Sequence, residues 1–242
     1  GTDTIEETVF AWDLVLRSSK PVVVTGAMRA SHEDGYDGPA NVRRAVAAAA
    51  APALRGVGVV VGLAGTLEAA DDATKLHTQA FDTFRSPNLG SLGRVGEDGV
   101  VVLDRPRGVR RSLTPAPTDG ARVELVQAGI GSDGAMLDAA VATGARGVVM
   151  AATGAGNTSA GLLAAAERAI AVGVTVVLAS RCPAGAVSTA YAFPGGGATW
   201  VRAGAIPTGT LCAIKARVAL ALGLGAGLAR EDLATLLADP IG

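Results

Sequence analysis

Residues 21–63 read PVVVTGAMRASHEDGYDGPANVRRAVAAAAAPALRGVGVVVGL. The stretch opens with an apolar run at 21–25, continues through an Ala-rich segment at 39–51 and closes with a second apolar run at 57–63. Short runs of Val and Leu are typical of strands buried on both faces, and a helix between two such strands joins them in parallel. The stretch therefore predicts a β-α-β unit in a parallel sheet that helices cover.

A further helix is predicted before this unit, because apolar residues in the segment 4–18 recur at close to helical spacing. Thr4 and Glu7 fit a capping box at the start of that helix. Asp37 is a candidate cap for the helix at 39–51, with Pro39 in its first turn.

The alternation of strands and helices restarts near residue 122. We expect strands at 122–127, 147–152 and 174–179, helices at 133–143, 158–172, 209–222 and 231–237, and an irregular segment at 181–198. The predicted fold is therefore α/β, with two α/β units whose sheets are mainly parallel.

A change of composition separates the two units. Residues 105–111 are rich in arginine and residues 114–120 in proline and polar residues. We predict domains at 1–104 and 122–242, joined by a linker at 105–121. The arginines are interpreted as solvated linker charges, with a phosphate-binding patch as the alternative.

Composition excludes several functional classes. The 242 residues are 49% hydrophobic and 18% charged, with a formal net charge of −1, which fits neither a disordered chain nor a basic nucleic-acid binder. No apolar stretch reaches the roughly 20 residues that a membrane helix needs. Cys182 and Cys212 are too few for a disulfide framework or a four-Cys zinc site, and His32 and His77 have no second ligand at metal spacing. We therefore expect no metal and no nucleic-acid or membrane partner.

A glycine-rich turn at residues 153–157, TGAGN, lies between a predicted strand and a predicted helix. Backbone N–H groups at such a turn can bind an anion. A dinucleotide fingerprint requires G-x-G-x-x-G, but the next glycine after Gly156 is Gly161. We interpret the segment as a tight turn with Asn157 as the helix cap.

Lysine is rare in this chain and accounts for three of its 21 basic residues. Unlike arginine, a lysine can lose its proton when it is desolvated. Lys75 follows the predicted strand at 57–63, at the carboxyl edge where α/β proteins bind ligands. Lys20 and Lys215 are interpreted as surface residues, which leaves Lys75 as the candidate for chemistry.

Several motifs occur together in a characteristic order. They are GTDTIEET at 1–8, PVVVTGAMR at 21–29 with DGPAN at 37–41, Thr74-Lys75, GAGN at 154–157 and SRCPAG at 180–185. Together they resemble the bacterial-type L-asparaginase/glutaminase family of threonine amidohydrolases over nearly the whole chain.

The resemblance implies roles for particular residues. Thr2, Asp3 and Lys75 would form the family's second catalytic triad, in which Lys75 and Thr2 activate a hydroxyl or a water. Asp3 would bind the α-amino group of the substrate, the backbone of Ala27 its amide, and Asn157 would reach a neighbouring subunit's site. Thr2 would also contact the substrate.

The resemblance also implies the reaction, which is hydrolysis of L-asparagine to L-aspartate and ammonia in asparagine metabolism. It implies no cofactor, and backbone donors for the oxyanion of the tetrahedral intermediate. A site shared between subunits implies a homotetramer, built as a dimer of dimers.

Two features depart from the family pattern. The family's primary nucleophile is a threonine in a T-G-G-T-I type segment before the G-T-D-T block, and the 242 residues contain no such segment. We expect that threonine, the opening strands and the lid in an upstream part of a longer chain, with a truncated reading frame as the alternative. We also expect the 242 residues alone to hydrolyse asparagine poorly or not at all. Residues 187–193 contain no acidic residue where some members place a glutamate from the adjacent subunit, and Tyr191 is the candidate substitute. The preference between asparagine and glutamine therefore stays open.

Two other functions stay open as well. The chain could be the amidase subunit of a tRNA-dependent amidotransferase, or a non-catalytic module of the family that binds an amino acid or only oligomerises. Two cysteines fit a reducing cytosol and an oxidising periplasm alike, with the cytoplasm slightly favoured.

Overall fold

The computed structural model describes residues 1–114 and 116–239. They form two compact units, Gly1–Ser112 and Leu113–Asp239. The boundary between the units falls inside the segment 105–121, for which the composition predicts a linker. None of the helices within the described ranges has both the length and the hydropathy needed to cross a membrane.

The first unit has a mixed sheet between helices. Its elements are α1 (Ile5–Val15), β1 (Val22–Val24), α2 (Gly38–Ala50), a 3-10 turn (Pro52–Leu54), β2 (Val59–Leu63), β3 (Thr66–Ala69), β4 (Thr74–Lys75), β5 (Phe84–Arg85), β6 (Gly93–Val95) and β7 (Val101–Leu103). Within residues 1–114, five strands form one sheet in the order β1-β2-β3-β6-β7, and β4 pairs with β5 alone.

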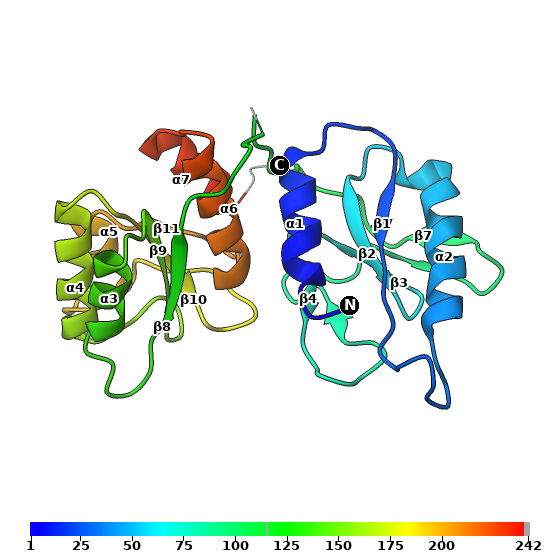
Figure 1. The fold of residues 1–242 in the computed structure, drawn as a ribbon, viewed down its shortest axis with the longest axis horizontal. Helices are drawn as coiled ribbons and strands as arrows, with labels where there is room; N and C mark the ends of the chain where they lie inside the picture. Colours follow the sequence, from blue (N-terminus) through cyan, green and yellow to red (C-terminus); the bar gives the residue numbers. More distant parts are fainter. Residues whose placement is uncertain (115, 240–242) are drawn as a thin grey trace. The chain divides into compact units, whose positions relative to one another are not determined.

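Strand β2 is apolar throughout because both of its faces are covered. Val59 and Val61 pack in one cluster with Ile5 of α1, and Val60 packs in a second cluster with Ala48 of α2. Since successive side chains of a strand point to opposite faces, the two clusters lie on opposite sides of the sheet. Figure 1 shows α1 and α2 on these two sides.

Among the described residues of the first unit, parallel pairing is limited to β1 and β2, which form the predicted β-α-β unit with α2. The other pairs, β2–β3, β3–β6 and β6–β7, are antiparallel. Ala64 and Gly65 reverse the chain after β2 with φ of 52° and 83°, the left-handed values that a tight hairpin turn requires. The antiparallel half of this sheet was not predicted.

The second unit matches the predicted alternation, apart from a helix at Gly197–Ala203 and a strand at Ile206–Pro207 that were not predicted. Its elements are β8 (Val123–Gln127), α3 (Ala135–Ala142), β9 (Gly147–Ala152), α4 (Ala160–Ala171), β10 (Thr175–Ser180), α5 (Gly197–Ala203), β11 (Ile206–Pro207), α6 (Ala213–Gly225) and α7 (Arg230–Leu237). The sheet order is β11-β10-β9-β8, and every pair in it is parallel. The predicted parallel sheet is therefore confirmed here.

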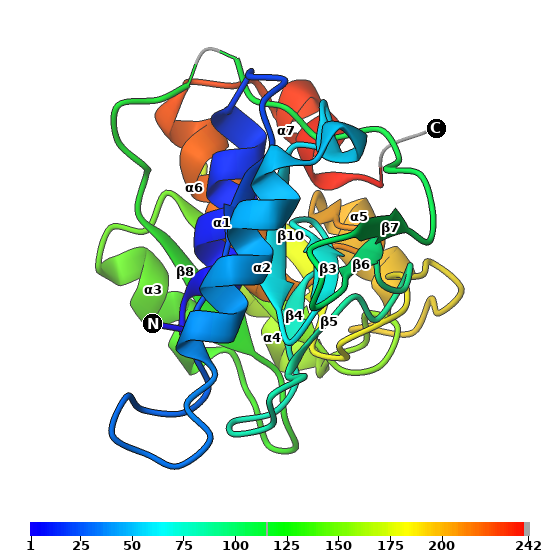
Figure 2. The same cartoon turned by 90° about the vertical axis from the view of Figure 1, so that its right-hand side faces the viewer.

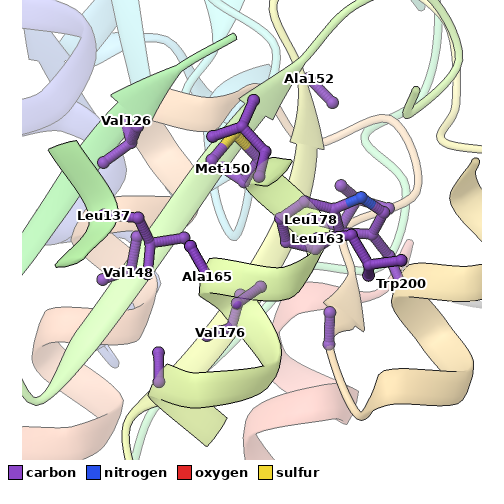
Figure 3. Packing of buried hydrophobic residues seen from close by; sticks show 14 of the residues in the cluster. Val126, Leu137, Val148, Met150, Ala152, Leu163, Ala165, Val176, Leu178 and Trp200 are labelled. Atoms are coloured by element: carbon purple, nitrogen blue, oxygen red, sulfur yellow. The ribbon is translucent and has the colours of Figure 1, made fainter. Parts of the chain in front are cut away.

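The core of the second unit lies between this sheet and helices α3, α4 and α5. Met150 and Leu178 face Leu137 of α3, Ala165 of α4 and Trp200 of α5 (Figure 3). The other face of the sheet packs against α6, which contacts β8, β9 and β10.

The predicted side-chain caps are wrong. Neither Thr4 nor Asp37 makes a cap hydrogen bond to its helix, and α4 is capped by Ser159, whose hydroxyl accepts the Leu162 amide at 3.2 Å, and not by Asn157. Asp37 accepts amides of its preceding loop instead. The local sequence could not show that Asp37 does not cap its helix, because the amides that its carboxylate accepts belong to residues eight or nine positions earlier.

The interpretation of the arginines as solvated charges is wrong for Arg107 and Arg110. Arg107 lies 2.9 Å from Asp13 and 3.2 Å from Asp71, and its side chain is only 5% exposed. Arg110 lies 3.0 Å from the same Asp13. These ion pairs fasten the segment to α1 of the first unit, so its first half is packed structure.

The interpretation of Lys215 as a surface residue is also wrong. It lies in α6 and is fully buried, whereas Lys20 is exposed as expected. The apolar pattern of α6 extends all around the helix, so spacing alone could not show which residues face the sheet.

Candidate active site

Lys75 connects two segments that are far apart in the sequence. Its Nζ donates to Thr2 Oγ1 at 2.9 Å and lies 3.1 Å from Asp3 Oδ1. Thr2 is 8% exposed, the Lys75 side chain is 16% exposed and the Asp3 carboxylate is 94% exposed. The Lys75 side-chain nitrogen thus bridges a buried hydroxyl and a carboxylate that is open to solvent.

The route of the chain to Lys75 differs from the prediction. The sequence placed Lys75 at the carboxyl edge of β2, but β3 follows β2 and runs antiparallel to it. Lys75 lies in β4, opposite Phe84 of β5. The beginning of the chain, the loop 25–37 and the loop 76–83 after β4 lie at the same end of the first unit (Figure 1 and Figure 2).

Glu6 supports this arrangement, and the sequence analysis did not single it out. It is 9% exposed, and its Oε2 accepts the backbone N–H of Lys75 at 3.1 Å. Glu6 lies in the first turn of α1, shortly after Thr2 and Asp3. The sequence feature that could have singled out Glu6 is an acidic residue in the first turn of the predicted helix.

The segment after β1 lies beside Thr2. A β-carbon added at Gly26 would lie 2.9 Å from Thr2 Cγ2 and 3.4 Å from Ile5 Cδ1. Only glycine allows the backbone to pass this close. Ala27, the next residue, is half-buried.

Asn157 belongs to the second unit. Its backbone pairs with Thr153 in an isolated bridge, with both N–H···O distances at 2.9 Å, and closes the turn after β9. Its Oδ1 is buried and has no hydrogen-bond partner within the described residues. Of the predicted site residues, the structure brings together Thr2, Asp3 and Lys75, with Ala27 on the segment beside them.

Metal-ligating side chains do not gather anywhere in the described ranges. No group of three or more His, Cys, Asp or Glu side chains that could hold a metal ion occurs in residues 1–114 or 116–239. His77 has a structural hydrogen-bonding role, as its Nδ1 accepts the amides of Gln79 and Ala80, both at 3.0 Å.

Two family models match this chain. The model for the asparaginase N-terminal domain matches residues 1–107, and the model for the glutaminase/asparaginase C-terminal domain matches residues 122–237. A probable L-asparaginase from Deinococcus radiodurans is 39% identical over 237 residues, which are 96% of this chain and 71% of that protein. This chain belongs to the asparaginase family. The resemblance of its motifs to that family of amidohydrolases is thereby confirmed.

Similarity to two other members of the asparaginase family supports this assignment. A probable periplasmic L-asparaginase from Haemophilus influenzae is 36% identical, over 93% of this chain and 64% of that protein. The crystal structure of a probable cytoplasmic L-asparaginase from Campylobacter jejuni superposes with a TM-score of 0.84 at 31% identity, covering 93% of this chain and 72% of that one. The α/β fold with two domains is therefore that of the asparaginases.

Proposed function

We propose that this chain takes part in the hydrolysis of L-asparagine to L-aspartate and ammonia, with Thr2, Asp3 and Lys75 as the retained part of the catalytic machinery. The contact of Lys75 Nζ with Thr2 Oγ1 at 2.9 Å carries the proposal. At this distance a proton can pass directly between the two groups. L-asparaginase is also the name of the relatives from three genera of bacteria.

In the proposed mechanism, Lys75 and Thr2 act as one unit. With Lys75 as the neutral amine, Thr2 Oγ1 takes a proton from the attacking water or hydroxyl and passes its own proton to Lys75 Nζ. The attacking oxygen adds to the amide carbon, the C–N bond then breaks, and Nζ returns the proton to the departing nitrogen, which leaves as ammonia. Where the attacking group is a hydroxyl, a water activated in the same way then hydrolyses the resulting ester. Asp3 accepts a hydrogen bond from the α-amino group of the substrate. Its high exposure suits this role, because the carboxylate is open to an incoming ligand while it also holds Lys75.

The substrate is proposed to contact two further residues. The backbone of Ala27 binds its side-chain amide, and Asn157 reaches the site of a neighbouring subunit in a homotetramer. The buried Oδ1 of Asn157, which has no partner within the described residues, supports a contact from outside its own unit.

The test is ammonia release by the native full-length protein from L-asparagine and, separately, from L-glutamine. We expect turnover of L-asparagine and its loss in Thr2→Val, which keeps the shape of the side chain and removes its hydroxyl. Tight binding of L-aspartate in calorimetry without turnover would favour the non-catalytic alternative. Release of ammonia from glutamine only in the presence of a partner protein would favour the amidotransferase alternative.

A further inference from the structure

The backbone N–H and C=O of Ala27 are the feature of the first unit that carries this inference. Strand β1 ends at Val24, and neither the N–H nor the C=O of Ala27 makes a hydrogen bond within residues 1–114 and 116–239. Half-buried backbone groups normally find partners. Those of Ala27 lie on the segment that passes Thr2 and are available to a ligand.

The neighbours of Ala27, by contrast, are held firmly. Asn41 Nδ2 donates to the carbonyl oxygen of Gly26 at 3.0 Å. The amide of Met28 donates to both carboxylate oxygens of Asp37, at 3.0 and 3.1 Å, and the amide of Arg29 donates to Asp37 Oδ1 at 3.1 Å.

These contacts set the direction of both free groups of Ala27. A trans peptide is planar, and its C=O and N–H point to opposite sides. Because the Gly26 carbonyl points to Asn41, the N–H of Ala27 points away from it. Because the Met28 amide points to Asp37, the C=O of Ala27 points away from Asp37.

The two polar side chains also fix each other. Asn41 Nδ2 donates to Asp37 Oδ2 at 2.8 Å, and Asn41 Oδ1 accepts the Ala64 amide at 3.1 Å from the turn between β2 and β3. Asn41 is 2% exposed. Both of its amide hydrogens and its oxygen are therefore used, so its orientation is determined by its partners.

We propose that Asp37 and Asn41 are positioning residues that aim the backbone of Ala27 at the side-chain amide of the substrate. The inference rests on the proposed function and goes beyond it by assigning the control of amide recognition to two residues that touch no substrate. It also gives a reason for the failure of Asp37 to cap α2, since its carboxylate holds Met28 and Arg29 instead.

Asn41→Asp and the double exchange Asp37→Asn with Asn41→Asp test this in the native full-length protein. Asn41→Asp alone sets two carboxylates against each other and loses the donor to Gly26. In the double exchange, the new amide group at position 37 donates to the new carboxylate at position 41. The amide oxygen at position 37 still accepts the Met28 and Arg29 amides, and the carboxylate at position 41 still accepts the Ala64 amide. The hydrogen bond to the Gly26 carbonyl and the second hydrogen bond of the Met28 amide, to the atom that becomes Nδ2, are then missing.

Ser91→Ala is the matched control for these variants. It removes a 2.6 Å hydrogen bond to buried Glu68 in the same unit, so it also deletes a polar contact of the first unit. It leaves every contact of Asp37 and Asn41 in place. It therefore reports the effect of a lost hydrogen bond that does not hold the Ala27 segment.

We expect kcat/KM for L-asparagine to fall about 10- to 100-fold in Asn41→Asp, because a small misplacement of a binding group is costly. The double exchange should recover part of this loss. The side-chain carboxylate of L-aspartate can accept the Ala27 N–H but has no N–H to donate to the Ala27 carbonyl, so its inhibition constant should change several-fold less than kcat/KM for L-asparagine in each variant. Ser91→Ala should leave all of these values unchanged.

The outcomes separate the two proposals. Wild-type turnover with an unchanged kcat/KM in Asn41→Asp would overturn the positioning role and leave the proposed function intact. Equal weakening of L-asparagine turnover and L-aspartate inhibition would also overturn it, since that is the effect of general damage to the site. No turnover by the wild-type protein would refute the proposed function and, with it, this inference.

Discussion

Replacing Asp13 by alanine would remove the carboxylate at the centre of a buried ion cluster in the first unit. Asp13 is 4% exposed and lies 2.9 Å from Arg107 and 3.0 Å from Arg110, and its Oδ1 accepts the Val59 amide at 2.8 Å. The substitution leaves Arg107 and the first amide of β2 without this partner.

The expected loss of unfolding free energy depends on the partners that the two arginines keep in Asp13→Ala. Breaking a buried ion pair from one side costs about 3–5 kcal/mol. Arg107 keeps Asp71 at 3.2 Å, and Arg110 keeps the carbonyl oxygens of residues 13 and 16. We therefore expect a loss near the lower limit, about 3 kcal/mol, which corresponds to about 1–3 M in the urea midpoint.

The chain offers a separate reporter for each unit. Trp12 lies in α1 and is 46% exposed, and Trp200 lies in the core of the second unit and is fully buried. Urea unfolding followed by fluorescence in a Trp200→Phe background should show the loss through Trp12. In a Trp12→Phe background, Trp200 should report an unchanged midpoint for the second unit.

Asp104→Ala is the matched control. Asp104 pairs with Arg94 at 2.8 Å, but the two side chains are 35% and 66% exposed. An exposed pair contributes at most about 1 kcal/mol. If Asp13→Ala costs no more than Asp104→Ala, burial of the cluster does not contribute to stability, and the argument from the distances and exposures is refuted.

Two further substitutions test the packing of the second unit, with Trp200 fluorescence in urea as the measurement. Ser159→Ala should cost about 1 kcal/mol, because it removes the cap of α4, and an unchanged midpoint would contradict the cap. Gly147→Ala should cost about 1–3 kcal/mol, because its β-carbon would lie 2.8 Å from Leu220 Cδ2 and 3.1 Å from Leu224 Cδ1. A neutral or stabilising Gly147→Ala would show that α6 can move away from β9 at little cost.

The regular part of the fold is predictable from the sequence because its determinants are local. The strand β9 was predicted with its observed bounds, since a run of apolar residues between turn signals leaves little choice. Strands β3 to β7 have two to four residues each, which is too short to show a periodic pattern of apolar residues, and β3 pairs with β6 although β4 and β5 lie between them in the chain. Their antiparallel pairing could not be predicted for this reason.

The site was predicted through its motifs and not through its geometry. Composition singled out Lys75, and the resemblance paired it with Thr2, but the roles of Glu6, Asp37 and Asn41 depend on partners distant in sequence. Burial of Arg107 and Lys215 was missed for the same reason. Charged residues are mostly exposed in proteins, so a buried charge can be predicted only when its partner in the fold is known.

The central claim is that Lys75 performs proton transfer in amide hydrolysis. The most direct test is the rate of ammonia release from L-asparagine by wild-type protein, Lys75→Met and Lys20→Met, the last being an exposed lysine of the same unit. We predict a loss of at least about 100-fold in Lys75→Met, within the range of general acid–base catalysis, and wild-type activity in Lys20→Met. Wild-type turnover in Lys75→Met would contradict the account.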